Sequence, residues 1–190
     1  LAYYPLDGSG RDIHGTHSGS LIGTSPTTNL HDYYEKALRL DGVDDYVEIK
    51  EAPEFETNQQ TVSIWVKSDT LSQGDLVSKD NGISSSGERQ WLMYLQENGK
   101  IGSVIWTPNG MNLRESNTSL NQGQWHHLVR TWDGNSMSLY IDGNLDFRIE
   151  TTGNSLVAGS HNIHLGGDPS NPYASQNIFF DGSLDEFRFY

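Results

Sequence analysis

Apolar and polar residues alternate along several short segments of the chain. The clearest segment is 60–67, in which Val62, Ile64 and Val66 alternate with more polar neighbours. Because successive side chains of a strand point to opposite faces, this pattern predicts a β-strand with one face in a core. Trp65 falls on the other face, where we expect a loop to cover it, since large aromatic side chains are highly buried on average.

Similar runs recur along the chain and are separated by turn residues. Eight Asp-Gly or Asn-Gly pairs are present, and glycine and asparagine tolerate the positive φ of tight turns. The other predicted strands, apart from the hairpin described next, are 2–6, 37–41, 46–49, 75–79, 90–96, 100–107, 111–115, 145–151, 162–166 and 178–190. About a dozen strands at regular spacing predict an all-β protein, a two-sheet antiparallel jelly-roll sandwich.

The strongest hairpin signal lies at 125–144. Two runs rich in aromatic and β-branched residues flank Asp133-Gly134-Asn135, and a second Asp-Gly-Asn follows at 142–144. A three-residue loop pairs Arg130 with Ser138. It gives one apolar face, made of His127, Val129, Thr131, Met137, Leu139 and Ile141, and a second face with His126, Arg130, Trp132 and Tyr140. A two-residue loop would place Arg130 beside Leu139, and we reject that register because a buried, unpaired guanidinium is costly.

Length and composition narrow the functional classes. At 190 residues with 34% hydrophobic residues and 20 glycines, the chain suits one many-turned β domain. The net charge of −13 opposes binding to nucleic acid or to an anionic membrane. Acidic Asp-Gly loops suit calcium, which binds carboxylate and carbonyl oxygens. A metal held by Asp7 and Asp12 could also pin the long loop predicted at 7–33, which is unusual in a compact domain.

The termini and the absence of cysteine bear on location. No cysteine is present, so disulfides and thiolate chemistry are excluded. The chain begins at Leu1 and contains neither a signal peptide nor an apolar run long enough to span a bilayer. We therefore expect a module of a longer polypeptide, next to other domains of the same chain and without membrane insertion.

Five sequence blocks together resemble a known family. They are 4–10 with Asp12, 37–47, 61–66, 125–129 and 182–188. Their order resembles the laminin G-like jelly-roll domains of the concanavalin A-like lectin/glucanase superfamily. The resemblance implies a curved sandwich that binds a ligand on its concave face or loop rim. It also implies a structural calcium at Asp7 or Asp12, at Asp41 with the Gly42 carbonyl, and at Asp185.

Catalytic chemistry finds little support in the residue spacing. Retaining β-glucanases of this superfamily carry Glu-x-Asp-x-x-Glu on one strand, and no such spacing is present. The adjacent pair Asp185-Glu186 is predicted to point to opposite faces, so the two carboxylates could not act on one bond. His126 and His127 face apart for the same reason and form a poor zinc site, and we expect His127 in the core.

Sugar binding suits the remaining polar and aromatic residues. Aromatic rings stack on sugar rings, while Arg, Asn, Asp and Gln bind hydroxyl groups. The candidate ligand-binding residues are Trp65, Trp106, Arg130, Trp132 and Tyr140 on strands, and Asn109, Arg114 and Tyr173 on loops. We expect a non-catalytic, calcium-stabilised carbohydrate-binding module of a secreted or cell-surface protein, with a glycan or polysaccharide as partner. The alternatives are a protein-binding adhesion module and a glycoside hydrolase with an unrecognised active site.

Overall fold

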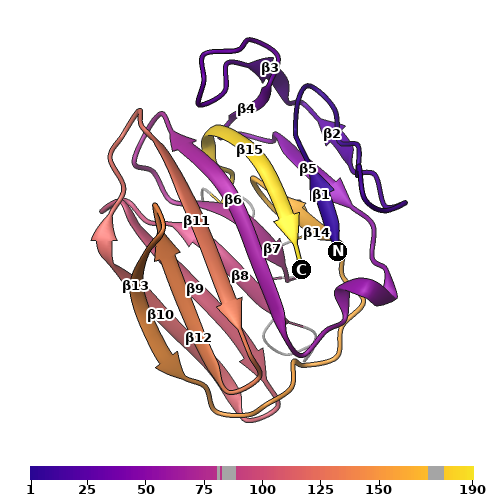
Figure 1. The fold of residues 1–190 in the computed structure, drawn as a ribbon, viewed down its shortest axis with the longest axis vertical. Coiled ribbons are helices and arrows are strands. Elements are labelled where there is room, and N and C mark those ends of the chain that lie inside the picture. Colours follow the sequence, from indigo (N-terminus) through magenta and orange to yellow (C-terminus); the bar gives the residue numbers. More distant parts are fainter. Residues whose placement is uncertain (81, 83–88, 171–177) are drawn as a thin grey trace.

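The computed structural model describes residues 1–80, 82, 89–170 and 178–190 and contains two antiparallel sheets (Figure 1). The larger sheet has the order β13-β12-β11-β6-β15-β4-β3, and β1 also pairs with β15. Its strands are β1 Ala2–Tyr4, β3 Ser25–Thr27, β4 Ala37–Asp41, β6 Gln60–Ser68, β11 Trp125–Trp132, β12 Ser136–Ile141, β13 Asn144–Glu150 and β15 Asp181–Phe189. The predicted jelly-roll sandwich is confirmed.

The smaller sheet has the order β10-β9-β8-β7-β14-β5-β2. Its strands are β2 Ser20–Ile22, β5 Tyr46–Ile49, β7 Gly74–Lys79, β8 Trp91–Leu95, β9 Lys100–Thr107, β10 Gly110–Ser119 and β14 Ile163–Leu165. A short 3₁₀ helix, η1 Pro53–Phe55, follows β5. Most predicted strands match within a few residues. The segment 7–33, predicted as loop, contains the two short strands β2 and β3. No helix of the described residues is long and apolar enough to cross a bilayer.

The core lies between the two sheets. Val62, Ile64 and Val66 of β6 are fully buried, as their alternation predicts. The terminal strands contribute from the same sheet, because β1 pairs with β15 near the two chain ends (Figure 1). The rings of Tyr4 and Phe187 stack at 5.6 Å between centroids. Strands from both ends of the sequence therefore close one apolar core.

The predicted register of the central hairpin is wrong. Arg130 pairs with Leu139, and Val129 pairs with Tyr140, which corresponds to the two-residue turn that the sequence argument rejects. Asp133 N–H closes this turn by donating to the Ser136 carbonyl at 3.2 Å. Every other residue of β11 is buried, so the face with His126, Leu128, Arg130 and Trp132 lies in the core. His127, Val129 and Thr131 lie on the outer face instead.

Specific contacts let the core accept the Arg130 side chain. Arg130 is fully buried, its guanidinium lies 4.6 Å from the centroid of the Trp91 ring, and Nη2 donates to Gln60 Oε1. A desolvated cation over an aromatic face is stabilised by the ring quadrupole. Burial still lowers the pKa of Arg130 to about 9, so the ring and the amide offset only part of the desolvation.

We expect Arg130→Ala to destabilise the fold as strongly as Leu139→Ala, its cross-strand neighbour. Truncating a large core side chain costs about 2–5 kcal/mol through lost burial and a cavity. Arg130→Met keeps most of the volume and removes the buried charge, so its cost is smaller. Urea denaturation measures the free energies of unfolding. A fully stable Arg130→Ala variant would mean that the guanidinium does not occupy the core.

Candidate functional site

A pocket of about 220 Å³ lies on the outer face of the larger sheet, where β6 and β15 run side by side. Residues 29–31, which lie between β3 and β4, form its other wall. The pocket is lined by Asn29, Leu30, His31, Trp65, Asp185 and Glu186. Two residues singled out by the sequence, Trp65 and Asp185, therefore lie in one site.

A β-bulge in β15 brings Glu186 into this pocket beside Asp185. Asp185 pairs with Trp65, but Arg188 pairs with Ser63, so β15 carries one extra residue opposite β6. Glu186 is this extra residue. Its φ is positive, at 53°, a conformation that is uncommon outside glycine. The prediction that Asp185 and Glu186 point to opposite faces is therefore wrong, because strict alternation holds only for a strand without a bulge.

The Asp185 carboxyl group is buried without full hydrogen bonding. The residue is only 4% exposed, and its Oδ1 has no hydrogen-bond partner among the residues that the structure describes. Burial, together with the charges of Glu186 and Asp7, raises the pKa of Asp185 to about 7. An unpartnered buried carboxyl group is costly. Such a group in a pocket is more typical of a binding site than of a structural position.

Glu186 is held in place by two neighbours. Its carboxylate accepts a hydrogen bond from the Tyr3 hydroxyl at 2.7 Å and one from Arg188 Nη2 at 2.5 Å. The Arg188 guanidinium in turn lies 4.3 Å from the centroid of the Tyr3 ring. Burial and the contact with Glu186 raise the pKa of Tyr3. Glu186 thus lines the pocket in a fixed position, and its negative charge is already paired with Arg188.

Trp65 supplies an aromatic surface that is only partly buried. Its ring stacks on the His127 ring, with centroids 4.9 Å apart and an interplanar angle of 18°. His127 Nε2 and Ser63 Oγ lie 2.8 Å apart in a hydrogen bond, and burial lowers the pKa of His127. The expectation of a core His127 is wrong, since it braces Trp65 on the outer face.

The segment 28–36 carries functional candidates that the sequence argument missed. Asn29 Oδ1 accepts from the backbone N–H groups of His31 and Tyr33, at 2.9 and 3.2 Å. Asp32 and Glu35 have positive φ angles of 60° and 58°, and such strain clusters at functional sites. Tyr33 and Tyr34 are 65% and 68% exposed. In the sequence, the available signal for this segment was the pair of adjacent tyrosines among polar residues.

The other predicted ligand-binding residues lie apart from this pocket. Tyr140 is on the outer face of β12 but does not line the pocket. Trp106 lies on the smaller sheet beneath Arg89, and Asn109 is in the β9–β10 turn. The prediction of Arg114 on a loop is wrong, because it lies on β10, where it contacts Asn117. Arg130 and Trp132 are buried in the core and face away from any ligand at the surface, a correction that follows from the register. Tyr173 lies outside the described residues.

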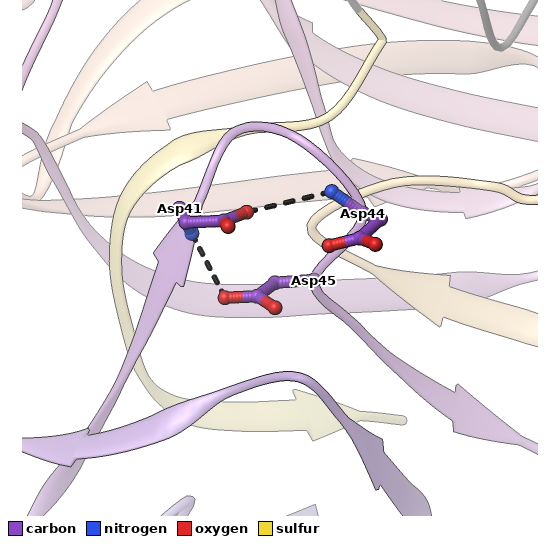
Figure 2. Close-up of side chains that lie close together, drawn as sticks. All are labelled: Asp41, Asp44 and Asp45. Carbon is purple, nitrogen blue, oxygen red and sulfur yellow. Dashed lines mark hydrogen bonds between the residues drawn. The ribbon is translucent and has the colours of Figure 1, made fainter.

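A second polar group lies in the turn between β4 and β5. Asp41, Asp44 and Asp45 place carboxylate oxygens within 4.8 Å of one another (Figure 2). Asp41 N–H donates to Asp45 Oδ2 at 3.0 Å, and Asp44 N–H donates to Asp41 Oδ1 at 3.4 Å. Burial, and the charges of Asp41 and Asp44, raise the pKa of Asp45. The turn needs Gly42, whose φ is 78° and where a Cβ would lie 2.7 Å from Asp181 Cβ.

The predicted calcium ligands do not converge on this turn as one set. Asp41 and Gly42 belong to it, whereas Asp185 lies in the pocket and Asp7 faces Lys36 at 3.8 Å. Asp12 Oδ1 accepts from the N–H groups of Tyr3 and His14, both at 3.1 Å. Burial alone would raise the pKa of Asp12, but backbone donors together lower it. Asp12 therefore organises the segment after β1 through hydrogen bonds.

The Asp185 geometry predicts a pH-dependent stability. A carboxyl group whose folded-state pKa is raised destabilises the protein as pH rises from the unfolded pKa, near 4, to about 7. The charged groups that act on it are Glu186 and Asp7, which raise the pKa, and Arg188, which lowers it. We expect Asp185→Asn to raise the melting temperature at pH 8 and to change it little at pH 4.

Thermal unfolding of both proteins at the two pH values measures this difference. Glu97→Gln, at an exposed position, removes one negative charge elsewhere and serves as the control. An equal gain at pH 8 in both variants would assign the effect to net charge, contradicting a buried, destabilising Asp185.

Several solved structures have a fold similar to that of this chain. Domain 4 of AbnA, a GH43 extracellular arabinanase from Geobacillus stearothermophilus, solved with arabinotriose, has a TM-score of 0.71 and 20% identity, covering 100% of this chain and 90% of that one. The ligand-binding domain of botulinum neurotoxin serotype D, solved with N-acetylneuraminic acid, has a TM-score of 0.68 and 15% identity. The alignment covers all of this chain but only 47% of the toxin chain, so this chain spans about half of its length.

A more distant structure has the same fold. A SAP-like pentraxin from Limulus polyphemus has a TM-score of 0.52 and 16% identity over 79% of this chain and 77% of the pentraxin. No curated protein sequence matches the chain. A laminin G-type family profile, described as the concanavalin A-like lectin/glucanases superfamily, matches residues 41–190. The chain therefore belongs to the concanavalin A-like lectin/glucanases superfamily.

Proposed function

We propose that this chain is a non-catalytic carbohydrate-binding module whose ligand occupies the pocket between Trp65 and Asp185. The observation that carries this proposal is the combination, in one pocket, of a partly exposed indole ring with a buried carboxyl group whose Oδ1 has no hydrogen-bond partner among the described residues. An aromatic surface with a few placed polar groups is the usual composition of a small-molecule site. Both features also cost stability unless a ligand uses them.

The pocket dimensions and lining suit one sugar ring. A volume of about 220 Å³ is below the roughly 300–1,000 Å³ of sites for drug-sized ligands. The apolar face of a pyranose or furanose ring can pack on Trp65, while its hydroxyl groups reach the polar atoms of Asn29, His31 and Asp185. Tyr33 and Tyr34, which are exposed and follow His31 by two and three residues, offer further aromatic surface for neighbouring sugar units.

The similar structures support a carbohydrate as the class of ligand. The arabinanase domain was solved in complex with arabinotriose and the toxin domain in complex with N-acetylneuraminic acid, and both ligands are carbohydrates. Fold alone does not determine function. The assignment therefore rests on the pocket residues, and the carbohydrate ligands of the similar structures agree with it. We further propose that the module belongs to a larger secreted or cell-surface protein.

We also propose that calcium binds the acidic turn and stabilises the module. Three carboxylates in one turn, with Asp45 mostly buried, form the oxygen-rich, anionic donor set that calcium prefers. Asp41, Asp44 and Asp45 would hold the ion, and the Gly42 carbonyl lies in the same turn. The ion would neutralise the repulsion that raises the pKa of Asp45.

A catalytic role is disfavoured by the state of the two pocket carboxylates. The bulge places Asp185 and Glu186 in one site, so strand alternation no longer separates them. Glycoside hydrolysis needs an acid and a second carboxylate free to act as base or nucleophile. Glu186 is instead bound by Tyr3 and Arg188. We therefore assign this pair to binding.

The alternative, a protein-binding adhesion module, rests on a different surface. Met111 and Leu113 on β10 are 57% and 42% exposed, and they flank Trp106 and Val104 of β9 in register. Contiguous exposed apolar side chains often mark protein interfaces. Loss of partner binding in a Met111→Ser/Leu113→Ser variant, without any glycan binding by the wild type, would favour this alternative.

We expect Trp65→Ala to weaken glycan binding about tenfold or more, since lost ring stacking of about 1.5 kcal/mol corresponds to that factor. A glycan array followed by calorimetry with a bound sugar measures the change. Tyr140→Ala, on the same face but outside the pocket, is the matched control and should bind normally. Equal glycan binding by both variants would mean that the binding site lies outside this pocket. Release of reducing ends from the bound glycan, abolished by Asp185→Asn or Glu186→Gln, would make the protein an enzyme.

Calcium should raise the melting temperature by several degrees relative to chelator. Binding to the folded state adds about 2.7 kcal/mol at a hundredfold excess over Kd. Asp44→Asn should reduce this shift, whereas Asp7→Asn, which removes a carboxylate outside the turn, should retain it. Coincident melting curves for the wild type would contradict the calcium site. The opposite behaviour of the two variants would favour the ligand set near the N-terminus.

A further inference from the structure

The charges around the pocket are unequally compensated. Glu186 is paired with Arg188, and Arg188 is further engaged by the Tyr3 ring. Asp185 is not part of any ion pair among the described residues. The charges of Glu186 and Asp7 disfavour its ionised form, and Arg188, which is already paired with Glu186, favours it. The described residues that line the pocket include no lysine or arginine, and His31 is the one among them that can become a cation. Asp185 is thus the acid that a ligand must satisfy.

We infer that the pocket selects sugars that carry a free amino group, with the ammonium group placed between the Asp185 carboxylate and the face of Trp65. This inference rests on the proposed function and names the ligand class of the same site. It follows from three observations: the Oδ1 of Asp185, which has no hydrogen-bond partner among the described residues, the adjacent indole ring, and the absence of lysine and arginine from the described lining residues.

An ammonium group satisfies this pocket better than a hydroxyl group does. A hydroxyl group can donate one hydrogen bond to Oδ1 but leaves the buried negative charge uncompensated. An ammonium group makes a charge-assisted hydrogen bond, about twice as strong as a neutral one. It also interacts with the aromatic face of Trp65. A bound cation also favours the ionised form of the Asp185 carboxylate.

The same groups reject two related sugar classes. N-acetylation removes the ammonium charge and adds bulk in a pocket of about 220 Å³. A sugar carboxylate, as in uronic or sialic acids, would lie beside Asp185 in a chain of net charge −13, and like charges at short range repel. The order of affinity is therefore amino sugar, then neutral sugar, then acidic sugar.

The test compares methyl glycosides of glucosamine, N-acetylglucosamine, glucose and glucuronic acid, together with their galacto counterparts. Chemical-shift titration by NMR at pH 7 suits weak, single-ring ligands, and about 0.15 M salt screens the long-range field of the protein. We expect the amino sugar of the preferred configuration to bind at least tenfold more tightly than its N-acetyl form. Asp185→Asn should remove this preference, and Glu97→Gln, which changes net charge equally, should retain it.

The other outcomes overturn the inference in distinguishable ways. Equal binding of amino and N-acetyl sugars, with loss of both in Trp65→Ala, would sink the amine preference and leave the proposed function standing. A preference that persists in Asp185→Asn would assign it to net charge. Equal binding of Nα-acetyl-lysine methylamide would assign the site to a peptide amine instead of a sugar. Absence of binding by every sugar would overturn this inference together with the proposed function.

Discussion

The extra residue of β15 opposite β6 is the constraint on which the pocket depends. Without it, the alternation that buries Leu184 would turn Phe187 and Phe189 to solvent and bring Glu186 and Arg188 into the core. The bulge shifts the phase by one residue, so both phenylalanines stay fully buried. The positive φ of Glu186 carries the local strain. The same shift leaves two consecutive acidic residues on the outer face beside Trp65.

Burial of Arg130 shows how a core can tolerate a charge that is costly by itself. Desolvation disfavours the guanidinium, as its lowered pKa indicates. The Trp91 ring from the opposite sheet and the Gln60 amide from the neighbouring strand recover part of that cost. Because the contact with Trp91 joins the two sheets, it also fixes their relative position. A buried ionic group that specifies an arrangement is a recognised use of such residues.

The strands were predictable because local alternation determines which residues face the core. The 60–67 segment, the turn at Gly42 and the predicted sandwich all follow from such patterns. The hairpin register failed for a non-local reason, since Trp91 and Gln60, the residues that receive Arg130, are distant in sequence. The bulge did leave a sequence signal, because Leu184 and Phe187 are both apolar at positions of opposite parity. Strained loop residues such as Asp32 carry no signal of this kind.

The two acidic sites differ in what their sequence neighbours can supply. In the β4–β5 turn, Asp41, Asp44 and Asp45 are close in sequence, so repulsion among them is built into the turn. The charge of Arg39 and the Asp41 backbone N–H relieve part of it at Asp45. In the pocket, Glu186 obtains its counter-charge from Arg188, two positions further on the same strand. Asp185, which lies directly across the sheet from Trp65, forms no ion pair among the described residues. Its carboxyl group destabilises the empty fold, and a ligand that recovers this energy binds more tightly for the same reason.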